Sequence, residues 1–446
     1  MVSIGAGEYS AAVDHGGMRA AFGGLVGILA CLLVTAGPAS ADLIAPRSAA
    51  AFRDSVGVVT HAGFGDTAYG DWPRLVEKLD ELGVRHLRDG VYANPVDHRR
   101  EWNEHYYRAV ELAASRGMRF TFGFAGPAYD AGTMDQLLGV VAGRLRHAAE
   151  AIEAPNEYDR FMGGPQWPAV LASYDRLLYR RVNADPSLRS LPVLGPSLAT
   201  AGAEARLGDQ SAFLDRGNIH PYAGGRSPDP AHLEAEFADA ALVAANKPVW
   251  ATEAGYHNAV RTSSGHPGVS ESAGAVYITR TFLEHFASGV DRTFVYELVD
   301  EKPEPRLADL EQHFGLLRHD FSPKPAFTAL KHLLAAVGTS GPRARLRPLR
   351  MSMSGARPGI RRLVLQKGNG SYLVALWRLD SVWDPERRRA LHVRPDSLRL
   401  GLPRAARVSV TDPVLSGRAR PLRLRRGAAR LELGARPLVL TVTPRD

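Results

Sequence analysis

The sequence predicts an α/β fold in which a (β/α)8 TIM barrel is followed by a small C-terminal β-sandwich. Short apolar runs alternate with helix-like stretches from Val56 to Val337, a pattern typical of parallel β/α units. There are eight such runs, the number that a closed barrel needs. After Gly338 the pattern changes to short alternating strands. The 446 residues suit a barrel of roughly 250 to 300 residues plus a smaller domain.

The barrel strands are expected where short apolar runs are bounded by turn-forming residues. In chain order they are Val56–Val59, Val84–Arg88, Arg119–Phe124, Ala151–Pro155, Pro192–Gly195, Gly217–His220, Val249–Glu253 and Arg292–Tyr296.

Helices are expected between these runs, where apolar residues recur at helical spacing. The stretch 72–82 stops at Gly83 and the stretch 102–115 stops near Gly117, because glycine often follows a helix C-terminus. Further helices are predicted at 134–149, 167–184, 232–245 and 272–288.

The composition divides the chain into a barrel over 50–338 and a second domain over 342–446, with Thr-Ser-Gly-Pro at 339–342 as the linker. Gly368-Asn369-Gly370 is typical of a hairpin turn. We expect a β-sandwich of about 100 residues, whose Trp377 and Trp383 would either lie in the core or bind sugar. Its six strands are predicted at 362–366, 372–379, 391–393, 407–411, 431–433 and 438–442.

Residues 1–41 are expected to be an export signal that is removed before Asp42. An uncharged stretch over 20–36 precedes the small residues that signal cleavage requires. Acidic residues before Met18 are unusual in such a signal, so translation could begin at Met18. A retained membrane anchor is the alternative, although the stretch is short and rich in glycine. The sequence thus predicts a secreted protein with no stable membrane insertion after the signal is removed.

The net charge restricts the expected partners of the chain, and the cysteine content restricts its possible sites. The net charge is +8, and much of the arginine excess follows residue 340. Such a balance indicates either an anionic partner or solvated arginines in an Arg-rich chain. No basic run is interleaved with aromatic residues, so nucleic acid is not expected. The one cysteine, Cys31, lies in the expected signal, which excludes thiol catalysis, disulfides and cysteine zinc sites from the mature chain.

Two glutamates stand where barrel strands are expected to end. Asn156-Glu157 follows the fourth strand, and Glu253 ends the seventh. Functional groups of such barrels gather at the carboxyl ends of the strands. Glycoside hydrolysis needs one protonated and one ionised carboxyl group on either side of a sugar ring, with pKa values pushed apart. The sequence therefore favours these two glutamates as a catalytic pair.

Two segments resemble the retaining clan A glycoside hydrolases, which belong to a cellulase-like superfamily. Residues 152–158, Ile-Glu-Ala-Pro-Asn-Glu-Tyr, are similar to the fourth-strand Asn-Glu motif, and residues 250–256, Trp-Ala-Thr-Glu-Ala-Gly-Tyr, to the seventh-strand motif. The resemblance implies that Glu157 is the acid/base, that Glu253 is the nucleophile and that Asn156 holds the sugar 2-hydroxyl.

The same resemblance extends to three supporting residues. Arg88 matches the arginine that keeps the nucleophile ionised, although it could instead form a salt bridge with Asp89 or another acid and have no catalytic role. His220 and Tyr222 match a His-x-Tyr pattern beside the reaction centre. Glu153, inside the fourth strand, is interpreted as a structural partner.

Sugar sites also need aromatic surfaces on which pyranose faces stack. The clan usually has a tryptophan near the end of the eighth strand, where this chain has Tyr296-Glu297, so the sugar stays open. No compact ligand spacing or phosphate loop is present, and neither metal nor cofactor is expected. Candidate platforms are His61, Tyr92, Tyr158, Tyr256 and Tyr296.

The sequence as a whole predicts a secreted retaining glycoside hydrolase that cleaves O-glycosidic bonds of a poly- or oligosaccharide by double displacement. Two alternatives stay open. One is a non-catalytic carbohydrate-binding barrel at the cell surface. The other is binding of an anionic cell-wall polymer by the Arg-rich second domain.

Overall fold

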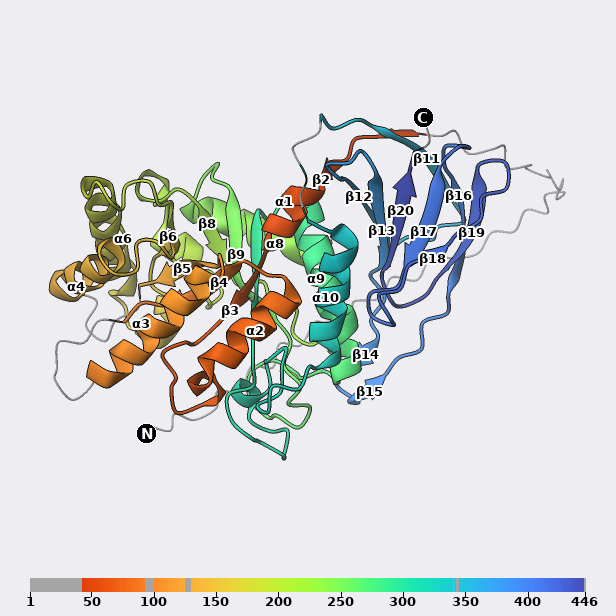
Figure 1. Ribbon diagram of the computed structural model, residues 1–446. Helices are drawn as coiled ribbons and strands as arrows, with labels where there is room; N and C mark the ends of the chain where they lie inside the picture. Colours follow the sequence, from red (N-terminus) through yellow and green to blue (C-terminus); the bar gives the residue numbers. More distant parts are fainter. Residues whose placement is uncertain (1–41, 93–99, 125–129, 340, 342–344, 445–446) are drawn as a thin grey trace, which may run out of the picture. The chain divides into compact units, whose positions relative to one another are not determined.

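A computed structural model describes residues 42–92, 100–124, 130–339, 341 and 345–444 (Figure 1). The expected export signal, with Met18 and Cys31, lies outside these residues, as do Ser340 and Pro342 of the expected linker. Among the helices within the described ranges, none is both long and apolar enough to span a membrane.

Eight parallel strands form the barrel, which confirms the fold class (Figure 1). Neighbouring strands pair in the order β7-β6-β5-β4-β3-β10-β9-β8. Leu194 of β7 and Arg216, just before β8, form a parallel bridge that links the two ends of this order. The strands are β3 (Val56–Val59), β4 (His86–Gly90), β5 (Arg119–Gly123), β6 (Ala149–Glu153), β7 (Val193–Leu194), β8 (Gly217–Ile219), β9 (Val249–Gly255) and β10 (Arg292–Tyr296).

Helices follow the strands along the chain, as β/α units require. The longer ones are α2 (Trp72–Leu82), α3 (Arg100–Ser115), α4 (Ala131–Ala142), α6 (Trp167–Ala184), α8 (Pro230–Val243), α9 (Glu271–Ser288) and α10 (Pro325–Val337). The shorter ones are α1 (Ala49–Asp54), α5 (Tyr158–Phe161) and α7 (Ala203–Leu207).

Helix α2 shows why the periodicity predicted it correctly. Its N-cap, Asp71, accepts a hydrogen bond from the backbone N–H of Arg74, and Gly83 closes it in the left-handed conformation at φ 82°. The predicted helix over 134–149 was too long, because α4 ends at Ala142 and Gly143 leaves the helical conformation. Residues 149–153 form strand β6 instead.

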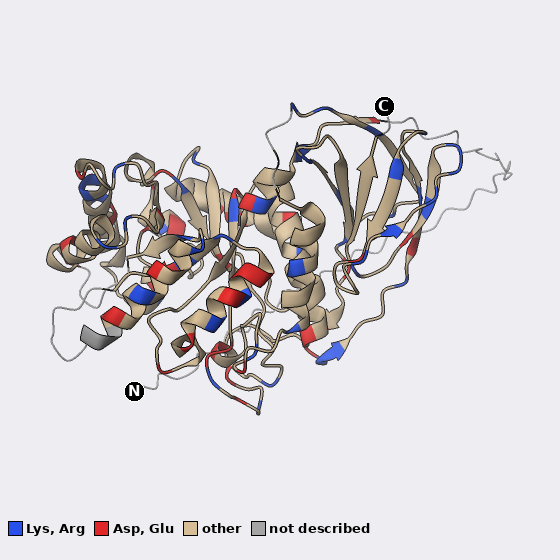
Figure 2. Cartoon of the chain, viewed as in Figure 1, with Lys and Arg blue, Asp and Glu red and all other residues tan. Residues whose placement is uncertain are grey.

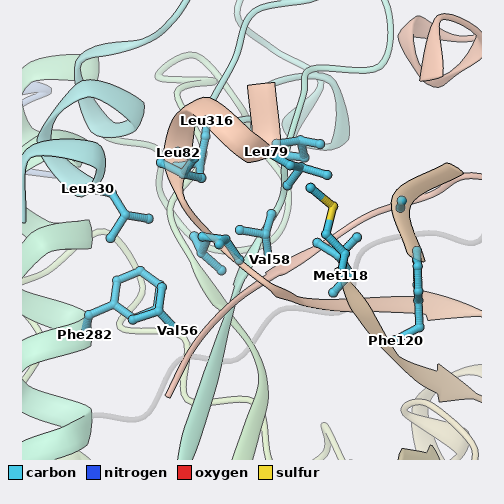
Figure 3. Close-up of a cluster of buried hydrophobic side chains, with 14 of the residues drawn as sticks. Val56, Val58, Leu79, Leu82, Met118, Phe120, Phe282, Leu316 and Leu330 are labelled. Atoms are coloured by element: carbon cyan, nitrogen blue, oxygen red, sulfur yellow. The ribbon is translucent and has the colours of Figure 1, made fainter. Parts of the chain in front are cut away.

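The main core lies between the strands and the helices. Val56 and Val58 of β3 belong to one buried cluster with Leu79 and Leu82 of α2 and Phe282 of α9 (Figure 3). Each of these side chains is at most 2% exposed. Burying such side chains contributes roughly 1.5–3 kcal/mol each.

The inside of the barrel holds a second, smaller cluster that includes Val59, Ala151, Trp250 and Phe294. Alternate residues of β3 belong to the main core and to this inner cluster, since successive side chains of a strand point to opposite faces. Gly57 faces this inner cluster, because a methyl group there would lie 2.4 Å from Phe294 Cδ1. The missing side chain at Gly57 thus makes room for the phenyl ring.

Two sheets form the β-rich part, with orders β1-β11-β16-β19 and β18-β17-β20-β13-β12-β2. One apolar cluster is shared by both sheets, as in a sandwich. A separate two-stranded pair joins β14 and β15. The strands are β1 (Asp42–Ile44), β2 (Arg47–Ser48), β11 (Leu349–Ser354), β12 (Ile360–Gln366), β13 (Tyr372–Arg378), β14 (Trp383–Asp384), β15 (Arg389–Ala390), β16 (Asp396–Gly401), β17 (Arg407–Thr411), β18 (Arg420–Pro421), β19 (Ala428–Leu433) and β20 (Leu438–Thr443).

The predicted hairpin at Gly368-Asn369-Gly370 is confirmed, since β12 and β13 pair antiparallel up to Gln366 and Tyr372. The predicted strand at 391–393 is wrong, because these residues lie between β15 and β16. Strands β1 and β2 were not predicted. They precede the barrel in sequence, yet β1 pairs with β11 and β2 with β12.

Buried polar contacts join α9 to the β-rich part. Glu284 is fully buried and accepts hydrogen bonds from Trp377 Nε1 at 2.9 Å and from Arg361 Nη2 at 2.6 Å. Trp383 is also buried, and its Nε1 donates to the Gly268 carbonyl at 3.1 Å. Both tryptophans therefore belong to the core, and Trp377 is fully buried.

Replacing Gly57 with alanine is expected to lower the thermal unfolding midpoint. Overpacking against Phe294 costs roughly 1–3 kcal/mol. Gly139→Ala is the matched control, because Gly139 is an exposed α4 residue where an added methyl group would meet nothing within 4 Å, and alanine stabilises a helix position by up to about 1 kcal/mol. Melting followed by circular dichroism checks both variants. If Gly57→Ala melted at or above the unmodified protein, the packing explanation would fail.

Candidate active site

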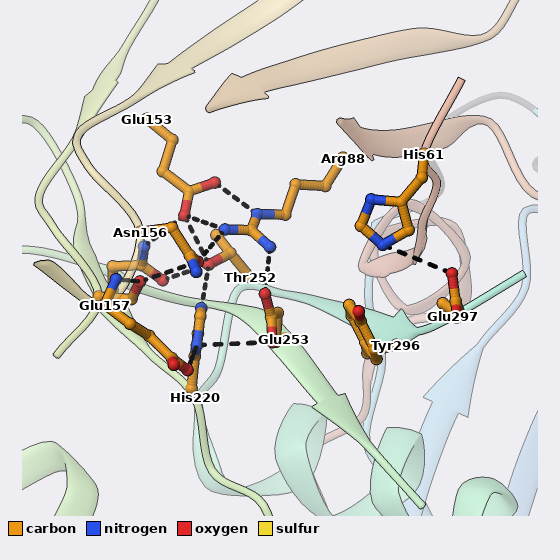
Figure 4. Close-up of polar contacts among 12 residues, drawn as sticks. His61, Arg88, Glu153, Asn156, Glu157, His220, Thr252, Glu253, Tyr296 and Glu297 are labelled. Atoms are coloured by element: carbon orange, nitrogen blue, oxygen red, sulfur yellow. Dashed lines mark hydrogen bonds and ion pairs between the residues drawn. The ribbon is translucent and has the colours of Figure 1, made fainter. Parts of the chain in front are cut away.

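The carboxyl ends of four barrel strands bring the predicted polar residues together (Figure 4). Arg88 lies in β4, Glu157 follows β6, His220 follows β8 and Glu253 lies in β9. Parallel strands of a barrel all end at one face, so residues far apart in sequence meet there. Hydrogen bonds and ion pairs connect these side chains.

The sequence predicted that Glu253 ends its strand. This is wrong, because β9 continues to Gly255. Along the pairing with β10, Ala251 faces Thr293 and Ala254 faces Val295. Thr252 and Glu253 therefore stand opposite a single residue, which is a β-bulge. Bulges redirect side chains, and here two consecutive residues both contact the polar site.

Glu253 is held as a carboxylate by its neighbours. Its Oε1 accepts from Arg88 Nη1 at 2.5 Å, and its Oε2 accepts from the Tyr222 hydroxyl at 2.7 Å. Burial by itself would raise the pKa of Glu253. The charges of His220 and Arg88, together with the two hydrogen bonds, outweigh this effect and lower that pKa to about 2.

Arg88 is buried and connects two carboxylates of the site, those of Glu153 and Glu253. Its Nε and Nη2 donate to the two oxygens of Glu153 at 2.7 and 2.8 Å. Its Nη2 also donates to Asn156 Oδ1 at 2.6 Å. Burial would lower the pKa of Arg88, but the charges of Glu153 and Glu253 raise it.

The alternative pairing of Arg88 with Asp89 is not observed. Asp89 Oδ2 accepts instead from the Thr60 hydroxyl at 2.7 Å and the Ala62 N–H at 2.8 Å. Burial raises the pKa of Asp89 to about 7. Glu153 is fully buried, whereas Glu157 and Glu253 keep 7% and 8% of their surface exposed. Glu153 therefore serves as a structural partner, as the sequence predicted.

Glu157 adopts an uncommon backbone conformation. Its φ and ψ are both 43°, in the left-handed region, and it stands at the N-cap of α5. Such a conformation costs a non-glycine residue about 1–2 kcal/mol, and strained residues often mark functional sites. Its N–H donates to the Ser197 carbonyl at 3.0 Å, which helps to hold this conformation.

The side chain of Glu157 contacts His220. Glu157 Oε1 lies 2.9 Å from His220 Nδ1, and Arg160 Nη1 lies 3.4 Å from Glu157 Oε2. Burial would lower the pKa of His220, but the charge of Glu253 and the hydrogen bond with Glu157 raise it.

The hydrogen bonds around His220 indicate where one proton lies. His220 Nε2 is 3.0 Å from the Thr252 hydroxyl. That hydroxyl has one proton, and its other two partners, Glu153 Oε1 at 3.0 Å and Asn218 Oδ1 at 2.8 Å, can only accept. Thr252 must therefore accept from His220 Nε2–H. The contact between His220 Nδ1 and Glu157 then needs a second proton, which the two groups share.

Glu157 and Glu253 approach each other closely. His220 Nδ1 lies 2.9 Å from Glu157 Oε1 and 3.7 Å from Glu253 Oε2, and one oxygen of each carboxylate lies within 4.8 Å of the other. These three residues could in principle hold a metal ion.

The predicted aromatic residues differ in their surroundings. His61 stacks on Phe64 with ring centroids 4.7 Å apart, and Tyr296 meets His61 edge-on at 5.6 Å. Both lie near Glu253, whose charge affects both of their pKa values. Tyr92 packs edge-on against Tyr106 at 5.0 Å.

Two further candidates lie in apolar surroundings. Tyr256 is buried against Tyr277 of α9, and its hydroxyl donates to the Arg226 carbonyl at 2.8 Å. Tyr158 is buried in a cluster with Trp167 and Leu171.

Glu297 was not predicted as a site residue, although it follows Tyr296. It is fully buried, accepts from the Tyr69 hydroxyl at 2.8 Å and lies 3.4 Å from His61 Nε2 (Figure 4). Burial raises the pKa of Glu297 well above its usual range. Burial likewise lowers the pKa of His61 to about 4. His61, Glu297 and Glu301 form a second group that could hold a metal ion.

Thr252 and Asn218 were also missed. Asn218 Nδ2 donates to Glu153 Oε1 at 3.0 Å. The alternation of a strand could have revealed Asn218, which is two residues before His220 and shares its face. Nothing in the sequence marks the bulge that brings Thr252 into the site.

Neither a protein-family model nor a curated protein matches the sequence. Three solved structures resemble the fold. A family 39 glycoside hydrolase from Bacteroides cellulosilyticus aligns with a TM-score of 0.59 at 16% identity, over 88% of this chain and 82% of that one. A monomeric β-xylosidase from Caulobacter crescentus aligns at 0.58 and 15%, over 92% and 100%. A glucosidase from Croceicoccus marinus aligns at 0.58 and 14%, over 92% and 99%. At these identities the likeness shows a shared fold.

The lowered pKa of Glu253 makes a prediction for stability. Ionised Glu253 stabilises the fold above its ordinary pKa of 4.5, and this contribution is lost as the pH falls toward 2. Glu253→Gln should therefore be less stable than the unmodified protein at pH 7, by up to about 3 kcal/mol. The difference should shrink below pH 4 or so. Chemical unfolding at several pH values measures it.

Glu77→Gln is the control, because Glu77 is exposed on α2. This variant should keep the slope of stability against pH. A stability difference between Glu253→Gln and the unmodified protein that stayed constant with pH would contradict the environment assigned to Glu253.

Proposed function

We propose that the protein is a retaining glycoside hydrolase, with Glu253 as nucleophile and Glu157 as acid/base. The observation that carries the proposal is the pair itself. One oxygen of Glu157, which follows β6, lies within 4.8 Å of one oxygen of Glu253 in β9; Glu253 is kept ionised, and Glu157 shares a proton with His220. Retaining enzymes place their carboxyl groups about 5–5.5 Å apart, and inverting enzymes about 6.5–9.5 Å. Oxygens this close fit the retaining arrangement and support double displacement.

In the first step a carboxylate oxygen of Glu253 attacks the anomeric carbon, and the glycosidic carbon–oxygen bond breaks. The leaving oxygen takes the proton shared by Glu157 and His220. Arg88 and Tyr222 each hold one oxygen of Glu253, which orients the attacking carboxylate. The product is a glycosyl ester on Glu253.

In the second step water replaces the leaving group. Glu157, now ionised, takes a proton from the water while the oxygen attacks the anomeric carbon, and the ester bond to Glu253 breaks. Asn156 would bind the sugar beside this bond. Its Oδ1 accepts from Arg88, which leaves the Nδ2 amide hydrogens for a sugar hydroxyl such as the 2-hydroxyl.

The substrate is proposed to be a poly- or oligosaccharide. The similar structures from Caulobacter crescentus and Croceicoccus marinus are described as a β-xylosidase and a glucosidase, so aryl β-xylosides and β-glucosides are the first substrates to test. The expected export signal at 1–41 supports action outside the cell.

Glu253→Gln is expected to lower kcat by a factor of at least about 10⁴, because an amide cannot form the glycosyl ester. Steady-state rates on an aryl glycoside that the unmodified protein cleaves give the measurement. Glu77→Gln again serves as control and should keep its rate. Binding of sugar with no turnover by the unmodified protein would favour the non-catalytic barrel instead.

Glu157→Ala is expected to slow substrates with poor leaving groups by about 10²–10⁴. Substrates with very good leaving groups should react to the glycosyl ester almost normally, because they need little proton donation. Added azide should then restore turnover, since an anion attacks the ester without a general base. An equal loss on good and poor leaving groups would argue against an acid role for Glu157.

A further inference from the structure

Charge is distributed unevenly along the chain. Residues 342–446 hold 24 Lys and Arg against seven Asp and Glu, whereas residues 1–341 hold 31 against 40. Figure 2 shows basic segments outnumbering acidic ones over the strands from β11 to β20. An arginine-rich composition shared by the whole chain would raise basic residues in both parts. The excess is confined to one of them and therefore needs a local explanation.

Part of this excess lines one hollow, which we call the arginine groove. Its volume is about 390 Å³. Its walls are Arg399, Arg423, Arg425, Ala428, Ala429 and Arg430. All four arginines are exposed, and among the described residues none of their guanidinium groups has a hydrogen bond or ion pair.

The strand register places two of these arginines opposite each other. Residues alternate between buried and exposed along β16 and β19, and Arg399 of β16 faces Arg430 of β19 on the exposed side. Like charges directly opposite on a sheet destabilise it. The acidic residue on this face, Glu432, lies opposite Ser397 and forms no ion pair with either arginine. An anion bound between the two guanidinium groups would relieve their repulsion.

A tight hairpin adds the remaining arginines. The N–H of Arg425 donates to the Ala428 carbonyl at 2.8 Å, and the N–H of Ala428 donates back at 3.0 Å. Arg426 and Gly427 between them have φ values of 53° and 81°, as a two-residue hairpin turn requires. The short turn fixes Arg423 and Arg425 beside the strands.

We propose that the arginine groove binds an acidic polysaccharide that carries carboxylate groups, and so holds the protein on this polymer. Guanidinium groups bind carboxylates with two parallel hydrogen bonds, and adjacent arginines can engage successive charged sugars. The groove walls contain only arginine and alanine. The walls therefore offer no aromatic platform for the bases of a single-stranded nucleic acid. A carboxylated polymer that is held through its charges, and not by ring stacking, needs no such platform. The proposal does not depend on catalysis by the barrel.

The test measures binding of the full chain to polygalacturonate. Binding is expected at about 50 mM NaCl and should weaken at least about tenfold at about 300 mM, because salt screens exposed charges. The double variant Arg399→Ser, Arg430→Ser should bind at least about fivefold more weakly. Neutral xylan should show no salt-dependent binding. Glu253→Gln should bind polygalacturonate normally, which separates this proposal from the proposed function.

Arg418→Ser, Arg420→Ser is the matched control, since both arginines are exposed on the same part and the net charge changes equally. This variant should keep its affinity within about twofold. Equal losses in the two double variants would overturn the groove as a site. No binding at low salt would also overturn it, and tighter binding of DNA than of polygalacturonate would assign the surface to nucleic acid instead. Unchanged melting curves establish that the variants fold.

Discussion

The buried guanidinium of Arg88 is the interaction on which the candidate site depends. It contacts both oxygens of Glu153, one oxygen of Glu253 and the amide oxygen of Asn156. A buried carboxylate is costly unless it is paired, and here one cation compensates two. Three strands of the barrel thereby meet at one side chain. The same contacts hold Glu253 ionised, so the fold and the chemistry of the site share one electrostatic requirement.

A second network controls the proton on the other side of the pair. Thr252 has one hydroxyl proton to donate to the acceptors Glu153 or Asn218, and it therefore accepts from His220. This order fixes the tautomer of His220 and leaves its Nδ1 facing Glu157. The two glutamates differ in role because their neighbours differ: Glu253 meets a permanent cation, whereas Glu157 meets a group that can gain or lose a proton. Enzymes give two carboxyl groups the roles of acid and nucleophile through such differences in their surroundings.

The β-rich part differs from the barrel in its electrostatic character. Its inner contacts are neutral or paired, as Glu284 with Arg361 and Trp377 shows. Its outer face carries Arg399 and Arg430 opposite each other, and neither guanidinium group has a partner within the described part of the chain. The chain therefore combines a site built from compensated charges with a surface whose charges are left uncompensated. Uncompensated charge is available to a partner, at the cost of some repulsion in the free protein.

Much of the architecture was readable from the sequence, because its patterns are local. Helix α2 and strands β3 and β10 have the predicted bounds, since period and capping are set by residues a few positions apart. The two glutamates and Arg88 could be named because each stands near the end of an apolar run, and strand ends of a barrel share one face.

Only the tertiary structure decided the rest. The bulge that brings Thr252 into the site arises from the pairing of β9 with β10. Strands β1 and β2 join sheets whose other members lie some 300 residues later, and Tyr69 reaches Glu297 across 228 positions. Such contacts leave no local pattern in the sequence, because the spacing and capping residues of each element do not depend on its distant partner. The sequence by itself determined which elements form and which side chains stand at their ends. The closing of the barrel decided which of those side chains touch, and hence which carboxyl group is charged.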